Sequence, residues 1–360
     1  MTEEYKQRRE RLREALVASK LDALIISGPP SVRYLTGFTG SNAMVLVPAG
    51  GEAVLLTDPR YEIQAAQDVS CRVSVVKTPL PKAVMSVARR KRLHRLGFES
   101  GRLTFADYEA LRECLWLGAS LEPAAGIVEK LRMVKSAVEV EAIRRSMQTA
   151  AEAYKQAMRR VRAGMLESDL AAELDHQMRR LGAEKPAFET IVLAGERTAL
   201  PHARPGPYPL IANRLLLVDA GAVQSGYASD MTRMAFLGTP GRRVRRLYKA
   251  VLEAQQAALS AVGPGILAGA VDQAARQVLR NYGLEQAFVH ATGHGVGLEI
   301  HEMPRLGKRE KTRLAAGMVV TVEPGAYIEG FGGIRIEDTV VVTSNGCEVL
   351  TPASRELLPL

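Results

Sequence analysis

Hydrophobic residues follow two different spacings along this chain of 360 residues, and the spacing changes near residue 127. A charged amphipathic segment at the N-terminus is followed by short apolar runs bounded by turn residues. These runs cover residues 21–26, 43–47 and 53–56. Short apolar runs of this kind predict buried strands, and their alternation with helical stretches predicts a small α/β domain over residues 1–126.

Residues 127–163 are rich in helix-forming residues, with apolar side chains three and four positions apart, which predicts helical structure. We expect a linker helix over 127–136 that breaks near Lys135 and Ser136, and then a long helix that Gly164 ends. Strand-rich segments alternate with helices in the remainder, so residues 137–360 are expected to form a second α/β (α+β) domain. The further predicted helices cover residues 167–181, 242–262 and 268–282.

One pattern occurs twice in the second domain. An apolar strand ends in a carboxylate closely followed by glycine, and a second strand after a short loop carries another carboxylate with threonine two positions later. The first copy contains Asp219 and Asp230, and the second contains Glu323 and Glu337. Because residues two apart share a strand face, the repeat predicts two similar β-hairpins that aim four carboxylates at one place. A chance likeness of two hairpins is the alternative.

Histidines add to this pattern. Three of the six histidines lie within twelve residues, at His290, His294 and His301, and the glycines beside His294 permit close backbone approach. Residues 298–301 alternate in the manner of a strand. A satisfied structural role is the alternative for a single histidine, but the cluster favours a functional site. A phosphate-binding loop is strongly disfavoured, since neither GxGxxG nor GxxxxGK[ST] occurs.

Buried carboxylates are costly unless they are paired or bind a metal, although any single one could instead lie at a strand edge or on the surface. Oxygen ligands with one imidazole suit a harder ion such as manganese, with cobalt and zinc as alternatives. Four carboxylates and one histidine exceed the needs of one ordinary catalytic ion. They fit two metal ions that activate a shared water, which indicates hydrolysis.

Several blocks resemble the creatinase/prolidase/methionine-aminopeptidase superfamily, whose catalytic domain has the pita-bread fold. The metal-site blocks are LLLVDAGA, GYASDMTR, HATGHGVGLEIHEMP, TVEPGAYIEGFGG and IRIED, and FETIVLAGERTALPHARP precedes them. SVRYLTGFTGSNA and TDPRY resemble the N-terminal domain of prolidases and Xaa-Pro aminopeptidases. The likeness implies a creatinase-type N-terminal domain and a pita-bread catalytic domain. Departures at Ala203, Met234 and Ala212–Asn213 affect no implied ligand.

The resemblance also implies roles for individual residues. Glu323 would carry the proton, and His301 would stabilise either the oxyanion or the adjacent amide. His202 would orient the substrate, and His290 would line the proline pocket. Tyr327 and Arg335 would lie at the substrate site, with Arg335 either contacting a substrate carboxylate or holding the acids in place. The implied metal ligands are Asp219, Asp230, His294, Glu323 and Glu337.

The implied reaction is two-metal hydrolysis of the bond before proline in short peptides. An Xaa-Pro aminopeptidase is slightly preferred over an Xaa-Pro dipeptidase (prolidase). A metal-free interaction protein on the same fold and a creatinase-type hydrolase of a non-peptide bond are the alternatives from other classes. The intact ligand set disfavours both. The resemblance implies a homodimer as well.

Composition changes this picture little. The formal net charge is +9, and the densest basic run extends from Arg89 to Arg95, but aromatic residues make up 5% of the chain and none interleaves with that run. A solvated helix face is therefore favoured over nucleic-acid binding. The three cysteines form no CxxC pair, and the N-terminus resembles neither a signal peptide nor a membrane span. We expect a cytoplasmic protein that binds neither nucleic acid nor membrane.

Overall fold

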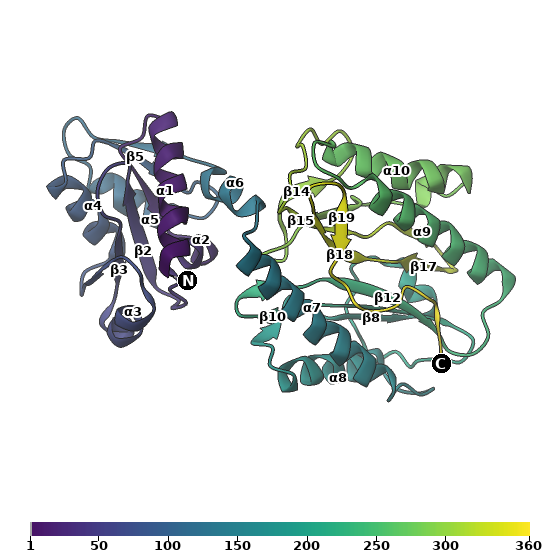
Figure 1. The fold of residues 1–360 in the computed structure, drawn as a ribbon. Helices are drawn as coiled ribbons and strands as arrows, with labels where there is room; N and C mark the ends of the chain where they lie inside the picture. Colours follow the sequence, from purple (N-terminus) through teal and green to yellow (C-terminus); the bar gives the residue numbers. More distant parts are fainter. Residues whose placement is uncertain (1) are drawn as a thin grey trace. The chain divides into compact units, whose positions relative to one another are not determined.

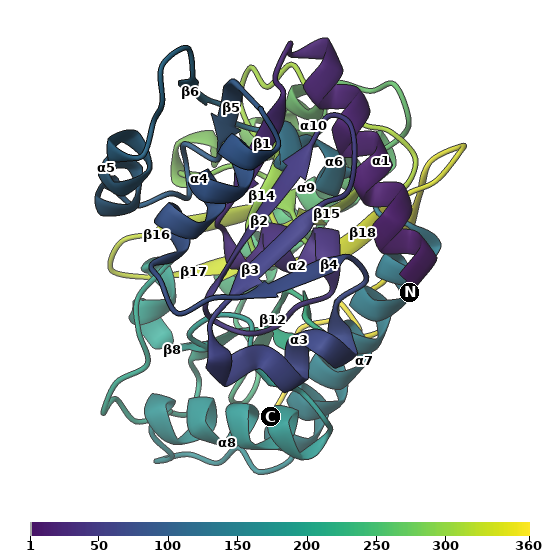
Figure 2. The same cartoon turned by 90° about the vertical axis from the view of Figure 1, so that its left-hand side faces the viewer.

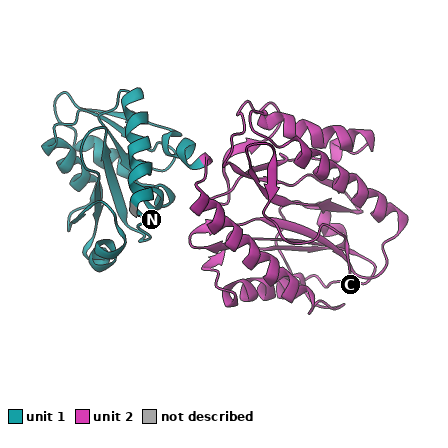
Figure 3. Cartoon of the chain, viewed as in Figure 1, with its two compact units in different colours: residues 1–132 teal, residues 133–360 magenta. Residues whose placement is uncertain are grey.

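The structure is a computed structural model that describes residues 2–360. It divides into two compact units, residues 1–132 and 133–360 (Figures 1 and 3). The division falls inside the segment 127–136 predicted to be a linker helix. There α6 (Ile127–Met133) ends, and α7 (Ala137–Met158) begins after a short break. Ser136 and Glu139 form a reciprocal capping box at the start of α7, which explains why the helix begins at this point.

The first unit contains a six-stranded sheet in the order β4-β3-β2-β1-β5-β6, in which β2 is antiparallel to both of its neighbours. Helices α1 and α4 lie on opposite sides of this sheet in Figure 1, and Figure 2 looks onto the strands. Its elements are α1 (Thr2–Ala18), β1 (Ala23–Ile26), α2 (Pro29–Thr36), β2 (Ala43–Pro48), β3 (Val54–Thr57), α3 (Glu62–Asp68), β4 (Arg72–Val75), α4 (Leu80–Arg90), β5 (Arg95–Phe98), α5 (Phe105–Glu113) and β6 (Ser120–Pro123). The three predicted strands therefore lie in this sheet.

The basic run Arg89–Arg95 covers the end of α4 and the start of β5. Arg89 and Arg90 are exposed in the last turn of α4, where positive charge interacts favourably with the helix dipole. Arg95 forms an ion pair with Glu122 of β6 (Nε–Oε1 2.9 Å). Local helix and strand contacts thus account for the run.

The second unit is built on two antiparallel strand pairs, β9 with β12 and β15 with β18. The two predicted hairpins are confirmed. Its helices are α7, α8 (Glu167–Arg180), α9 (Arg242–Ala261) and α10 (Ala268–Asn281), and its strands are β7 (Lys185–Pro186), β8 (Ile191–Ala194), β9 (Leu215–Ala220), β10 (Ala222–Gln224), β11 (Tyr227–Ala228), β12 (Met231–Phe236), β13 (Gly293–Gly295), β14 (Glu302–Leu306), β15 (Val319–Val322), β16 (Gly325–Ile328), β17 (Gly332–Arg335), β18 (Asp338–Val342), β19 (Cys347–Val349) and β20 (Leu358–Pro359). Helices α8, α9 and α10 begin at the predicted residues.

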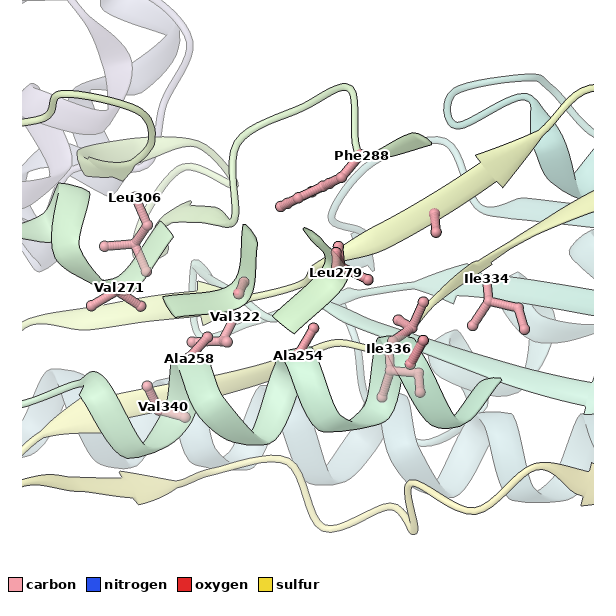
Figure 4. Close-up of a cluster of buried hydrophobic side chains, with 14 of the residues drawn as sticks. Ala254, Ala258, Val271, Leu279, Phe288, Leu306, Val322, Ile334, Ile336 and Val340 are labelled. Carbon is pink, nitrogen blue, oxygen red and sulfur yellow. The ribbon is translucent and has the colours of Figure 1, made fainter. Parts of the chain in front are cut away.

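Strand alternation determines where Asp219 points. Leu216 and Val218 of β9 pack in the cluster with α7 and α8, whereas Leu215 and Leu217 pack in the cluster with α9 and α10. Figure 4 shows part of this second cluster, in which Ala254 and Ala258 of α9 lie near Val322 of β15 and Val340 of β18. Asp219 shares the face of Leu215 and Leu217, so its carboxylate is directed to the side on which the second hairpin lies.

Among residues 2–360, no helix combines the length and the apolar character that crossing a membrane requires.

Candidate metal centre

Each of the two hairpins donates a threonine hydrogen bond to a carboxylate residue of the other hairpin. Asp230 directly precedes β12 and Glu337 directly precedes β18. Thr232 Oγ1 donates to Glu337 Oε2 (2.7 Å), and Thr339 Oγ1 donates to the carbonyl oxygen of Asp230 (2.9 Å). The threonine of each copy of the repeat therefore binds the carboxylate residue of the other copy. This reciprocity brings the two acids together.

Asp219, Asp230 and Glu337 are buried and close together, with one carboxylate oxygen from each within 4.8 Å of the others. His294 joins them: its Nε2 lies 3.5 Å from Asp230 Oδ2 and 3.4 Å from Glu323 Oε1. The structure thus brings together all five residues predicted as metal ligands. Glu323 is held by Thr321 Oγ1, which donates to Glu323 Oε1 (3.2 Å) and accepts from the His294 N–H (3.0 Å).

The electrostatics of this cluster are unfavourable without a cation. Burial, reinforced by repulsion from neighbouring carboxylates, raises the pKa values of Asp230 and Glu337 well above their ordinary range. Burial also raises the pKa of Glu323, although electrostatic interactions with His294 and Arg335 partly oppose this. Ionising all these acids at neutral pH would therefore need compensating positive charge.

Two buried oxygens, Asp219 Oδ1 and Glu337 Oε1, have no hydrogen-bond partner among the described residues. Unpartnered buried acceptors are costly and call for a ligand. Carboxylate oxygens with one imidazole nitrogen are donors that divalent ions of the manganese, cobalt and zinc series accept. The residues present therefore fit a divalent metal centre.

Arg335 directs all its guanidinium nitrogens into the protein. Its side chain is 2% exposed. Nη2 donates to Asp219 Oδ2 (2.6 Å), and Nε donates to Thr232 Oγ1 (3.0 Å). Nη1 donates to the Tyr327 hydroxyl (2.9 Å) and to the carbonyl oxygen of Pro201 (3.2 Å). Of the two predicted roles for Arg335, these contacts favour holding the site's acids in place.

His290 is held as a neutral ring. Its Nε2 lies 2.8 Å from the Tyr327 hydroxyl, and its Nδ1 lies 2.8 Å from the carbonyl oxygen of Ala291. Because Tyr327 accepts from Arg335, its proton is directed to His290 Nε2, which assigns the remaining ring proton to Nδ1. Burial, followed by repulsion from Arg335, lowers the pKa of His290 to about 4. Both ring nitrogens of His290 form hydrogen bonds within the protein, so a bound molecule would make mainly apolar contacts with the faces of the ring.

His301 and His202 lie on irregular segments. The His301 ring stands edge-on to the His294 ring, with centroids 4.3 Å apart. Residues 298–301 form a series of bends, so the predicted strand at this place is wrong. Partial burial and repulsion from His294 and His202 lower the pKa of His301. His202 is exposed and follows Pro201, which Arg335 binds. Its charge also lowers the pKa of His290.

Two family models match this chain. The model of metallopeptidase family M24 matches residues 141–344, which is more than half of the chain, and the creatinase/prolidase N-terminal domain matches residues 8–134. The chain belongs to metallopeptidase family M24. The predicted resemblance to the creatinase/prolidase family is therefore confirmed. The predicted α/β fold with its pita-bread catalytic domain and the predicted activity as a metallo-exopeptidase are confirmed as well.

Relatives of this M24 chain match it over nearly its full length. The Xaa-Pro dipeptidase of Pyrococcus furiosus is 36% identical over 98% of this chain and 100% of that protein. Among solved structures, the Xaa-Pro dipeptidase from Bacillus anthracis has a TM-score of 0.96 at 36% identity, covering 99% of this chain and 100% of that one. The X-Pro aminopeptidase from Thermotoga maritima has a TM-score of 0.90 at 33% identity, covering 97% and 99%.

Two residues of α10 that support the M24 site were not predicted. Arg276 donates to the carbonyl oxygens of Phe288 (2.9 Å) and His290 (2.5 Å), and it forms an ion pair with Asp272 (2.7 Å). Asp272 accepts from the N–H and the hydroxyl of Thr292 (3.2 and 2.9 Å). A charge pair four residues apart in a helix usually indicates an exposed face, so the sequence carries no signal for this buried clamp.

Proposed function

We propose that this M24 chain is an Xaa-Pro dipeptidase that uses two divalent metal ions, manganese first, with cobalt or zinc as alternatives. The observation that carries the proposal is the buried cluster of Asp219, Asp230 and Glu337 with the partly buried His294 and Glu323 beside it. Two oxygens of this set have no partner among the described residues. The dipeptidase subtype is supported by relatives of that name that match nearly the whole chain. They favour the dipeptidase over the aminopeptidase that the sequence alone slightly preferred.

Five residues would hold the ions: Asp219, Asp230, His294, Glu323 and Glu337. When bound, the ions would supply Lewis acidity that activates a water toward the carbonyl carbon before proline. Glu323 would accept the proton of the attacking water and pass it to the leaving nitrogen.

Other residues would bind and orient the peptide. His301, exposed beside His294, would donate a hydrogen bond to the developing oxyanion, and His202 would help to orient the substrate. His290 would line the proline pocket through its ring faces, because both of its nitrogens are engaged within the protein. Tyr327 and Arg335 would fix His290 and Asp219 rather than contact the peptide directly.

The second candidate is an Xaa-Pro aminopeptidase, supported by the full-length likeness to the structure of that name from Thermotoga maritima. The two activities differ in whether a residue beyond proline is accepted. A metal-free interaction protein is disfavoured by the complete ligand set. The homodimer and the cytoplasmic location stay predictions.

The test is hydrolysis of Ala-Pro and Ala-Pro-Ala by metal-stripped protein after manganese, cobalt or zinc is added back. Cleavage of Ala-Pro alone is expected, with Ala-Ala as the control for proline specificity. Preferred cleavage of the tripeptide would replace the dipeptidase with the aminopeptidase. Cleavage of neither proline peptide by protein that carries two bound ions would overturn the proposal.

A further inference from the structure

The short loop that carries His301 is shaped by its neighbours. We call residues 297–301 the His301 loop; it consists of bends and leads into β14 at Glu302. Inside the loop, the Gly297 N–H donates to the Glu299 carbonyl oxygen (3.0 Å), and the Glu299 N–H donates to Glu302 Oε1 (3.1 Å). Since the loop lacks a strand ladder, its conformation depends on what holds Gly297 and Glu302.

Lys135 holds the end of the loop. Its Nζ lies 3.1 Å from Glu302 Oε2, and the two side chains are 1% and 5% exposed. The backbone of Lys135 is fixed as well, because its N–H donates to the carbonyl oxygen of Gly317 (2.9 Å). A buried ammonium–carboxylate pair is strongly dependent on geometry, and the loss of one partner is costly. The position of Glu302 is therefore tied to the chain segment that precedes α7.

Glu139 holds the beginning of the loop through two consecutive residues of β11. One oxygen of Glu139 accepts from the Ser136 N–H (Oε2, 3.0 Å) in the capping box. The other oxygen accepts from the Tyr227 hydroxyl (Oε1, 2.9 Å). Tyr227 belongs to β11, and the next residue, Ala228, donates its N–H to the carbonyl oxygen of Gly297 (2.7 Å). The first turn of α7 thus reaches Gly297 by way of β11.

We infer that Lys135 and Glu139 are positioning residues that set the geometry of His301. They lie four residues apart, at the beginning of the second unit, and their contacts lead to the two ends of the same loop. The hydrogen bonds that carry this connection go to Glu302, Ser136 and Tyr227. The inference deepens the proposed function, on which it rests for the role of His301 toward the peptide.

Steady-state kinetics test whether Lys135 acts through His301. Lys135→Met is expected to lower kcat/KM for Ala-Pro by roughly 10- to 100-fold, the range for residues that orient a metal-site group, with metal content unchanged. Lys135→Arg, which keeps the charge, should recover part of the loss. The matched control is Lys155→Met, which removes an exposed lysine of α7.

A double variant separates positioning from general stabilisation. In protein that carries His301→Asn, the further change Lys135→Met should lower kcat/KM by less than about twofold, because the group being positioned is already absent. Losses that multiply in the double variant would show that Lys135 does not act through His301, and the inference would be overturned.

Hydrogen exchange tests the same inference without any turnover. Amides of residues 297–301 should exchange faster in Lys135→Met and in Tyr227→Phe, and at the wild-type rate in Lys155→Met. Tyr227→Phe removes a single hydroxyl group and keeps the assay informative if Lys135→Met fails to fold. Unchanged exchange in folded Tyr227→Phe, or in Lys135→Met where that variant folds, would overturn the inference. If wild-type protein cleaves neither proline peptide, the proposed function fails, yet this measurement still decides whether the loop is positioned as inferred.

Discussion

The carboxylates of the proposed metal centre repel one another unless a cation compensates their negative charge. Asp230 and Glu337 are held together by the reciprocal threonine contacts of the two hairpins, although burial and mutual repulsion disfavour their ionised forms. The fold therefore stabilises an arrangement that is costly by itself. A site of this kind uses metal binding to offset that cost, and the cost can be measured in metal-free protein.

Replacement of Asp230 by asparagine should disrupt the metal centre. Asp230 lies against Asp219, Glu337 and His294, so we expect the variant to lose bound metal. Its kcat should fall by more than roughly 100-fold, a larger loss than is usual for residues that contact a metal ligand but not the metal. Metal content by mass spectrometry and hydrolysis of Ala-Pro are the measurements. Asp68→Asn, at an exposed position, is the control. Full metal content together with full turnover would contradict the ligand assignment.

Glu337 should make the metal-free protein sensitive to pH. Its folded pKa lies well above the ordinary value of 4.5, so between these two values the folded state retains a proton that the unfolded chain has released. The stability that this group contributes is accordingly lost as pH rises through that window. In chelator at pH 7.5, Glu337→Gln should raise the free energy of unfolding, and the gain should vanish toward pH 4.5.

Urea unfolding at several pH values measures this difference. Saturating manganese provides the control, because the variant then lacks a ligand and should become less stable than the wild type. A metal-free wild type that is more stable than the variant at pH 7.5 would contradict the electrostatic account of the site.

The acids and the histidine of the candidate metal centre were predictable from the sequence, because the repeated hairpin pattern places each carboxylate at an equivalent position. Each carboxylate has a fixed place relative to a strand, and strand geometry then brings the acids together. The clamp of Asp272 and Arg276 could not be found in this way, since its partners are backbone carbonyls whose positions depend on the folded loop. Side chains that bind backbone across the fold leave no local spacing in the sequence.

At the scale of elements, close backbone contact around β13 is what places His294. A β-carbon added to Gly293 would lie 2.0 Å from the carbonyl oxygen of Thr321, where β13 runs beside β15. Gly295 is similarly confined, with a β-carbon 2.3 Å from the carbonyl oxygen of Met303. Glycine on both sides of His294 thus lets three strands approach closely enough for its ring to reach Asp230 and Glu323.

Gly293→Ala should therefore weaken both the fold and metal binding. The added methyl group must push β13 away from β15, which we expect to cost about 1–3 kcal/mol of unfolding free energy. It should also lower metal affinity, because His294 moves with the strand. Thermal unfolding and metal titration are the measurements, with Gly346→Ala as the control, since a β-carbon there meets no atom within 4 Å. A variant with unchanged affinity would show that the close approach does not position His294.

Helices and strands with strong periodicity were predictable because burial repeats along each element. The segment 298–301 was not, although its residues alternate in character. Ile300 packs against the cluster around Ile143 and Val296 without pairing to a neighbouring strand. Alternation indicates which side chains are buried, whereas a strand also requires a partner at the correct distance. The sequence shows which side chains are buried, but for so short a segment it does not show whether a partner strand lies beside it.

On the scale of the whole molecule, the chemistry is confined to one unit. Every residue predicted to bind metal or substrate lies between His202 and Glu337, within residues 133–360. The spacing of apolar residues changes near residue 127, which predicts a boundary there, and the two compact units divide between residues 132 and 133. The contacts by which Lys135 and Glu139 hold the His301 loop were not predictable, because their hydrogen bonds join residues 167 and 88 positions apart.

Metal binding should consequently protect only the second unit from hydrogen exchange. All five proposed ligands belong to that unit, and a ligand that binds only the native state stabilises it by about 2.7 kcal/mol at 100 times its dissociation constant. With manganese added to chelated protein, we expect slower exchange in peptides that contain Asp219, Asp230, His294, Glu323 and Glu337. Peptides of strands β1 to β6 should exchange as before. Protection of those strands to the same extent would mean that the two units unfold together, and protection confined to the first unit would place the metal elsewhere.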